Sequence, residues 1–260
     1  MTWLAVARRD VREYRADRTL ASFCAFFALA CGAVAYVATG DAGAPPLSEA
    51  LALMFLFGVP LTAASFVDES IPRAVVSGRV RLTLSLPHAR GEYVAGVGAA
   101  GLAATLLATA VGVASALAIY LVRGGPVAPL RLAGVCAVVS LLAAAFTAAT
   151  LAFTARSRSP TLSTATAYGF FLVSFVWPAF VQIGRLLLDG ELGIAVSDAA
   201  ANAVVHLSPV FAFQAALAGV ETGFGGASGS VPPWAGVLVL LAWTGLGYAL
   251  AARRFGSLEL

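Results

Sequence analysis

Six long apolar runs constrain this chain more than any other feature of its sequence. Each is long enough to cross the ~30 Å hydrocarbon core of a bilayer as an α-helix. The runs lie at residues 20–39, 50–67, 93–122, 132–155, 162–188 and 234–252. Because a helix satisfies its own backbone hydrogen bonds in lipid, the sequence predicts an all-α, polytopic membrane protein with six transmembrane helices.

Composition agrees with residence in a membrane. Of the 260 residues, 60% are hydrophobic and 11% are charged, and the mean hydropathy is +0.90. An average soluble domain has about 25% charged residues. The apolar surface of this chain is therefore expected to be covered by lipid, and we expect a multi-pass protein of the cell membrane.

The distribution of arginine predicts the orientation. All sixteen basic residues are arginine, and with six spans thirteen of them fall on the side that holds both termini. Positive charge marks the cytoplasmic side, so both termini are predicted to be cytoplasmic and residues 189–233 external. We expect the N-terminal region to remain as the first span rather than to be removed as a signal peptide, because its charged part is long and contains three acidic residues.

Residues 1–18 have the pattern of an amphipathic helix on the inner membrane surface. Trp3, Leu4, Val6 and other apolar residues fill one arc of the helical wheel, and arginines fill the opposite arc. Asp10 falls inside the apolar arc and interrupts it.

A further apolar segment, residues 199–220, lies between the fifth and sixth spans. Counting it as a crossing would move Arg253 and Arg254 to the external side. Pro209 interrupts it near the middle. We therefore expect broken, re-entrant or interfacial helices in this external connection, split near Pro209.

The third span carries small residues at every fourth position, which lets another helix approach closely. We expect this ridge to pack inside the helix bundle, with a seam between two copies of the chain as the alternative. The ridge consists of Gly96, Ala100, Ala104, Ala108, Gly112 and Ala116.

No residue pattern predicts catalysis, a metal site or a cofactor. Ser228 lies in a Gly-x-Ser-Gly sequence like that of rhomboid-type intramembrane proteases, but His88 and His206 both precede it, whereas that family has its histidine on a later span. The three cysteines lie in apolar runs without metal-ligand spacing. Cys24 and Cys31, seven residues apart, leave a thiolate relay open as an alternative.

Two sources of energy for transport are disfavoured within this chain: ion coupling and an ATPase site of its own. The spans contain no clear mid-membrane Asp, Glu, Arg or His, which an ion-coupled secondary transporter usually needs, although Thr, Ser and Gln182 could supply oxygen ligands. The sequence also contains no lysine, so it cannot form the P-loop of an ATPase.

The most polar long passage in the middle of the chain is SGRVRLTLSLPHARGEYVAG, residues 77–96. Leu82 and Leu86 are spaced i, i+4 beside Arg81 and Arg90, which predicts a short amphipathic helix that ends near Pro87. On the cytoplasmic side such a helix would offer a partner protein an apolar surface with charged edges. An ordinary solvated loop is the alternative.

This passage is similar to the cytoplasmic stretch between the second and third spans of type 2 ABC exporter permeases, which runs from Ser-Gly to Leu-Ser-Leu-Pro-x-x-Arg. Three further segments resemble the elbow helix, the loop after the fourth span and the Leu-x-Pro segment of that family: VARRDVREYRADRTL, ARSRSPTL and HLSPVFAFQAAL. The set resembles in particular the archaeal and nitrous-oxide-reductase-maturation branch. Acidic residues expected just before the Ser-Gly are replaced by apolar ones, and Asp68 and Glu69 lie further upstream.

The resemblance implies one permease domain over residues 1–260 that dimerises, or pairs with a similar subunit, and binds separate ABC-type ATPase subunits. Catalysis is then expected in the partner, and the chain itself needs no cofactor and no nucleic acid. Residues 68–92 would be the coupling segment, and 156–158 the neighbouring loop. The expected ATPase contacts are Gly78, Arg81, Leu82, Leu86, Pro87, His88, Arg90, Arg156 and Arg158.

Two other functions stay open at this point. A secondary transporter or channel would work without an ATPase, and a membrane anchor for an enzyme-maturation complex would bind partners without transporting anything. Export is the direction that the family resemblance implies.

Overall fold

The computed structural model describes residues 3–39, 46–80, 90–224 and 231–258 of the chain. These residues form helices and their connections, with no β-strand among them. Six helices are long and apolar enough to cross a membrane, which confirms the predicted six-span, all-α architecture. They are α2 (Thr19–Ala38), α3 (Leu47–Val67), α6 (Arg90–Val122), α7 (Pro129–Thr154), α8 (Pro160–Leu192) and α11 (Pro233–Gly256).

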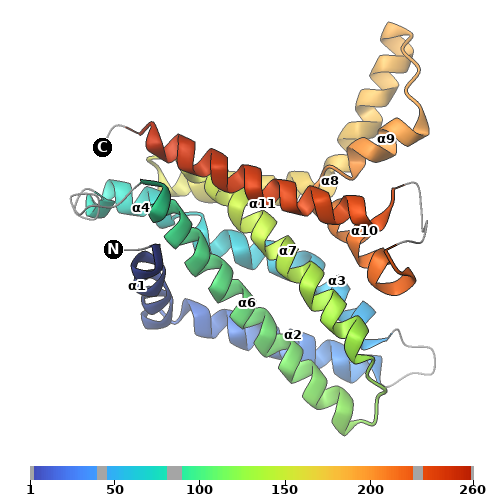
Figure 1. The fold of residues 1–260 in the computed structure, drawn as a ribbon, viewed down its shortest axis with the longest axis horizontal. Coiled ribbons are helices and arrows are strands. Elements are labelled where there is room, and N and C mark those ends of the chain that lie inside the picture. Colours follow the sequence, from blue (N-terminus) through green and yellow to red (C-terminus); the bar gives the residue numbers. More distant parts are fainter. Residues whose placement is uncertain (1–2, 40–45, 81–89, 225–230, 259–260) are drawn as a thin grey trace.

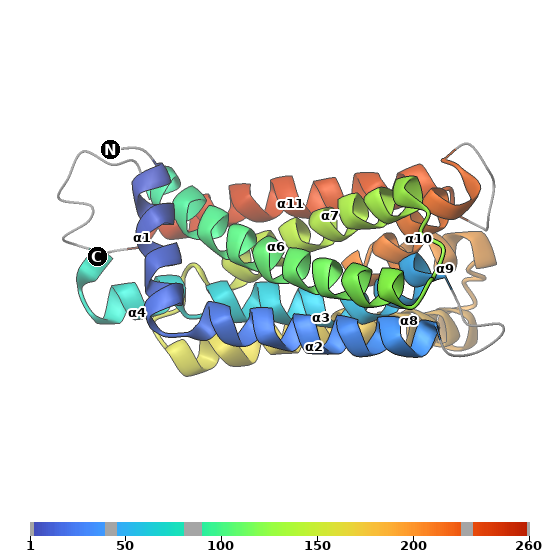
Figure 2. The same ribbon diagram turned by 90° about the horizontal axis from the view of Figure 1, so that it is seen from below.

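The long helices lie side by side along the longest axis of the molecule (Figures 1 and 2). Both termini lie at the same end of this bundle, together with α1 (Trp3–Ala16) and α4 (Ser70–Val76), which follows α3. We call this the proximal end, and the end at which α10 (Pro209–Thr222) lies the distal end. The shared position of the termini is what an even number of crossings requires.

Helix α1 lies across the proximal end of the bundle, at a steep angle to the long helices (Figure 2). Val6 and Ala7 of its apolar arc are buried, and so is Asp10. Trp3 and Leu4, from the same arc, are exposed. The apolar arc therefore serves two purposes, because part of it packs against the bundle and part remains available to lipid.

The ridge of small residues on α6 is buried along its whole length. A Cβ atom added to Gly96 would lie 2.6 Å from Cβ of Val6 in α1, and one added to Gly112 would lie 2.9 Å from Sγ of Cys31 in α2. The ridge thus accommodates α1 and α2 within the chain. Since van der Waals packing holds helices together in lipid, these close approaches contribute directly to the stability of the bundle.

The connection between α8 and α11 contains the expected broken helix. Helix α9 (Asp198–Val205) and α10 meet at a bend of 100°. The backbone at the break is hydrogen-bonded: Trp177 Nε1 donates to Val204 O, and Trp243 Nε1 donates to Leu207 O, each at 2.8 Å. Two tryptophan side chains thereby donate additional hydrogen bonds to carbonyl groups at the break.

The second half of α8 and helix α9 project away from the bundle (Figure 1). Pro178 lies inside α8, and a proline removes one helical hydrogen bond. The two helices enclose an apolar cavity of about 280 Å³. Only 6% of the most apolar window of α8 is buried, so this helix depends on lipid or on another chain for cover.

We predict that Gly96→Ala detaches α1 from the bundle. The new methyl group would meet both Cβ of Val6 and the backbone oxygen of Trp3, at 2.6 and 2.7 Å, and overpacking of this kind costs about 1–3 kcal/mol. Limited trypsin digestion measures the effect, because α1 contains four arginines. We expect cleavage within α1 to be about tenfold faster. Gly91→Ala is the control, since a Cβ there meets nothing within 4 Å. Equal cleavage of the two variants would contradict the prediction.

Candidate functional site

Within residues 68–92, the expected ATPase contacts run from Gly78 to Arg90, and from here on we call this part the coupling segment. It begins and ends in described structure, but its centre does not. The centre lies outside the described residues, so the amphipathic helix expected there stays a prediction. This applies to Arg81, Leu82, Leu86, Pro87 and His88. Gly78 and Arg90, at the two borders, are described and show how the segment is attached to the bundle.

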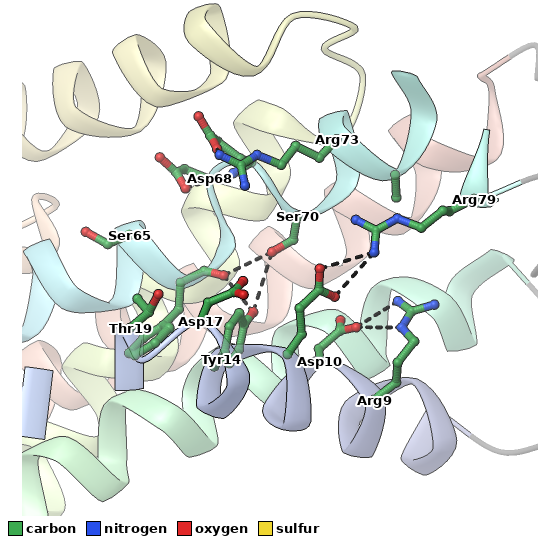
Figure 3. Close-up of a pocket in the computed structure, with 14 residues that line it drawn as sticks. Arg9, Asp10, Tyr14, Asp17, Thr19, Ser65, Asp68, Ser70, Arg73 and Arg79 are labelled. Atoms are coloured by element: carbon green, nitrogen blue, oxygen red, sulfur yellow. Dashed lines mark hydrogen bonds and ion pairs between the residues drawn. The ribbon is translucent and has the colours of Figure 1, made fainter. Parts of the chain in front are cut away.

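The segment starts at Gly78, two residues after α4 ends at Val76. This glycine has a φ of +72°, a left-handed conformation that favours glycine, and its N–H donates to Val75 O at 3.1 Å. The next residue, Arg79, forms an ion pair with Glu13 of α1, with 3.1 Å between Nη1 and Oε1 (Figure 3). The start of the segment is therefore bonded to the N-terminal helix.

Helix α1 is also bonded to the proximal end of α3. The Tyr14 hydroxyl donates to Phe66 O at 2.7 Å, and the two rings lie 4.9 Å apart between centroids. Burial raises the pKa of Tyr14 well above its ordinary value, so the hydroxyl keeps the proton that it donates. Figure 3 shows Tyr14 and the hydroxyl of Ser70 pointing toward each other across this junction.

Asp10, which interrupts the apolar arc of α1, is only 6% exposed. It pairs with Arg9 of the same helix, with 2.7 Å between Nη2 and Oδ1. The guanidinium carbon of Arg9 also lies 5.8 Å from the centre of the Tyr93 ring in α6. Burial raises the pKa of the Asp10 carboxyl, and the Arg9 guanidinium opposes this only in part.

A polar cavity of about 220 Å³ lies between α1 and the α3–α4 junction (Figure 3). Asp68 and Glu69, the acidic residues upstream of the Ser-Gly, line it but are engaged by the chain itself. Glu69 pairs with Arg73 and accepts a hydrogen bond from Thr164 Oγ1 at 3.1 Å, and Asp68 Oδ1 accepts one from the Glu69 N–H at 2.8 Å. Within the described part of the chain, no group of three or more His, Cys, Asp or Glu residues could hold a metal ion.

The segment ends at Arg90, the first residue of α6, whose side chain is bonded to the C-terminal end of α11. Its Nη1 donates to Gly256 O at 2.6 Å and to Leu258 O at 3.0 Å. Three residues further along α6, the Tyr93 ring stacks on Phe255 with 5.3 Å between centroids. The sequence carries no signal for these contacts, because they join residues more than 160 positions apart.

Arg156 and Arg158 lie in the connection between α7 and α8, also at the proximal end (Figure 2), and both are exposed. Ser159 caps the start of α8 by accepting the Leu162 N–H at 3.3 Å. Nearby, Arg254 of α11 donates to Ala152 O of α7 at 2.8 Å. The proximal end therefore brings together both borders of the coupling segment, the α7–α8 connection, α1 and the end of α11.

A family model described as ABC-2 family transporter protein matches residues 4–260, almost the whole chain. No curated protein matches the sequence.

We predict that Asp10→Asn strengthens the docking of α1 near pH 7.5, whereas Arg9→Ala weakens it. The raised pKa means that docking favours the protonated carboxyl, so the ionised group destabilises docked α1 as pH rises above its ordinary pKa of about 4. Arg9→Ala leaves the buried carboxylate without its ion pair.

Hydrogen exchange of the α1 amides measures both effects. We expect several-fold slower exchange in Asp10→Asn at pH 7.5 and no difference from the unchanged protein near pH 4. Arg8→Ala, on the exposed side of α1, controls for the loss of one positive charge. Faster exchange in Asp10→Asn than in the unchanged protein would show that the Arg9–Asp10 pair is a net stabilising interaction.

Proposed function

Because the chain belongs to the ABC-2 transporter family and is thus a membrane permease component of ABC transporters, we propose that it exports a substrate with energy from separate ATPase subunits. The observation that carries the proposal is a family match over residues 4–260 of a chain with six membrane-spanning helices. Residues 77–96 and the other motifs favour the archaeal and nitrous-oxide-reductase-maturation branch of the family. A membrane-anchor role within such a branch is the alternative that retains the family.

The proximal end is the proposed ATPase-binding surface and the proposed cytoplasmic face. The end of α4 and the exposed Arg156 and Arg158 of the α7–α8 connection lie at this end. In the proposed contact, Leu82 and Leu86 form the apolar surface and Arg81 and His88 its polar edges. ATP-driven closure of two ATPase subunits would push on this segment. The push would reach α3 through α4 and the bundle centre through α6.

We propose that two copies of the chain, or this chain and a similar subunit, form the complete translocation unit. Exposed apolar side chains on the second half of α8, such as Phe180, Ile183 and Leu187, support this pairing because another chain could cover them. Both termini would face the cytoplasm, and the α8–α11 connection would be external.

Topology is tested by single cysteines placed in a background without Cys24, Cys31 and Cys136. We expect a membrane-impermeant thiol reagent to label Ser228→Cys in intact cells. Ser77→Cys and Ser257→Cys should be labelled only after the membrane is opened. Labelling of Ser77→Cys but not Ser228→Cys in intact cells would invert the orientation and contradict a cytoplasmic ATPase surface at the proximal end.

Capture of an ABC-type ATPase subunit tests the coupling segment. We predict that replacing Leu82 and Leu86 together with Asp reduces capture at least tenfold, because a charge forced against an apolar surface costs about 2 kcal/mol or more unless it is paired. Replacement of Thr83 and Ser85 with Asp is the matched control, since it adds the same charge and keeps both leucines.

Both double variants should insert into the membrane normally. Full capture by the Leu82/Leu86 variant, with normal ATP hydrolysis, would show that the segment is an ordinary loop. Failure of the unchanged chain to capture any such ATPase would favour the transporter or anchor functions that need none.

A further inference from the structure

Arg90, at the C-terminal border of the coupling segment, bonds α6 to α11. It is the first residue of α6, and its side chain donates two hydrogen bonds at the end of α11, at 2.6 Å to Gly256 O and 3.0 Å to Leu258 O. Nothing in the family resemblance predicts this contact. The expected role of Arg90 was a contact with the ATPase.

The chemistry of a helix end explains why a guanidinium suits this position. The last four carbonyl groups of a helix have no donor within the helix, and they carry a partial negative charge. Gly256 is the last residue of α11, and Leu258 lies two residues beyond it. A single charged nitrogen therefore caps the last carbonyl of the helix, at Gly256, and also holds the chain just beyond the helix at Leu258, with charge-assisted hydrogen bonds.

Two further contacts join α6 and α11 next to this cap. The stacked rings of Tyr93 and Phe255 are 1% and 0% exposed, so the stack is fully enclosed by protein. Deeper in the bundle, a Cβ added to Gly98 would lie 2.4 Å from Cε1 of Tyr248, so glycine leaves room for the tyrosine ring. The bonded cap, the stack and the close approach lie along one seam between the two helices.

We propose that Arg90 is a latch that holds the proximal ends of α6 and α11 together, so that they move as one unit when the coupling segment moves. Arg90 is a positioning residue in this role, because it acts through the end of α11 and not on substrate or nucleotide. The consequence of this latch for transport rests on the proposed function. A displacement of the coupling segment would then reach the last span, α11, through the side chains of α6 that contact it.

Hydrogen exchange on the purified chain in lipid nanodiscs tests the latch without any partner. We expect the amides of residues 255–258 to exchange about tenfold faster in Arg90→Ala, the effect of losing charge-assisted hydrogen bonds. Arg253→Ala is the matched control, because it removes one positive charge from the exposed side of the same helix turn. Arg90→Lys, which keeps a cationic donor, should restore part of the protection. Equal exchange in Arg90→Ala and Arg253→Ala would overturn the inference.

Spin labels measure the joint movement. Gly91→Cys and Ser257→Cys place labels on either side of the latch, in a background without the native cysteines; a Cβ at Gly91 meets nothing within 4 Å. In the complex with the ATPase, we expect the same label distance without nucleotide and with ATP and vanadate. With Arg90→Ala added, the distance should change between these two conditions.

A change in label distance with the native Arg90 present would show that the two helix ends separate, and would overturn the inference. Absence of any ATPase capture would contradict the proposed function, while the exchange experiment would still decide whether the latch exists.

Discussion

Backbone hydrogen bonding in lipid is the constraint on which this structure depends. Every crossing is a helix because only a helix supplies donors for its own carbonyl groups there. Where the chain departs from a helix, side chains donate hydrogen bonds to its carbonyl groups, as Trp177 and Trp243 do at the break between α9 and α10. Arg90 does the same for Gly256, the last residue of α11, and for Leu258 just beyond it, at the opposite end of the bundle.

Helix α6 is the centre of the packing because it carries small residues where other helices contact it. The absence of side-chain bulk at Gly96, Gly98 and Gly112 lets α1, α11 and α2 approach it on different sides. Each approach brings a larger side chain or the backbone of the neighbour to the place where a Cβ would otherwise be. Helix α6, with several such sites, thus helps to determine the positions of three other helices. The coupling segment, which leads into the N-terminal end of α6, is connected through this helix to much of the bundle.

The sequence predicted the features that depend on local pattern. The six spans, the helix at residues 3–16 and the break near Pro209 follow from apolar length, periodicity and proline, which act over a few turns of chain. Asp10 was recognised as an interruption of an apolar arc, but its pairing with Arg9 over the Tyr93 ring was not. Arg90 was assigned to the ATPase contact, and its partner at Gly256 could not be predicted because the two residues are close only after folding. The hydrogen bond between Glu69 and Thr164 was missed for the same reason. Residues 81–89, which carry most of the predicted ATPase contacts, lie outside the described structure.

The position of α1 has a consequence for the order in which the protein is assembled. Helix α1 is synthesised before every span, but its docking partners, Phe66 at the end of α3 and Gly96 on α6, are made much later. Until Gly96 has left the ribosome and entered the membrane, the surface against which α1 docks is incomplete. A segment made before all six spans is thus among the later ones to reach its final place, and its amphipathic character allows it to wait at the lipid surface.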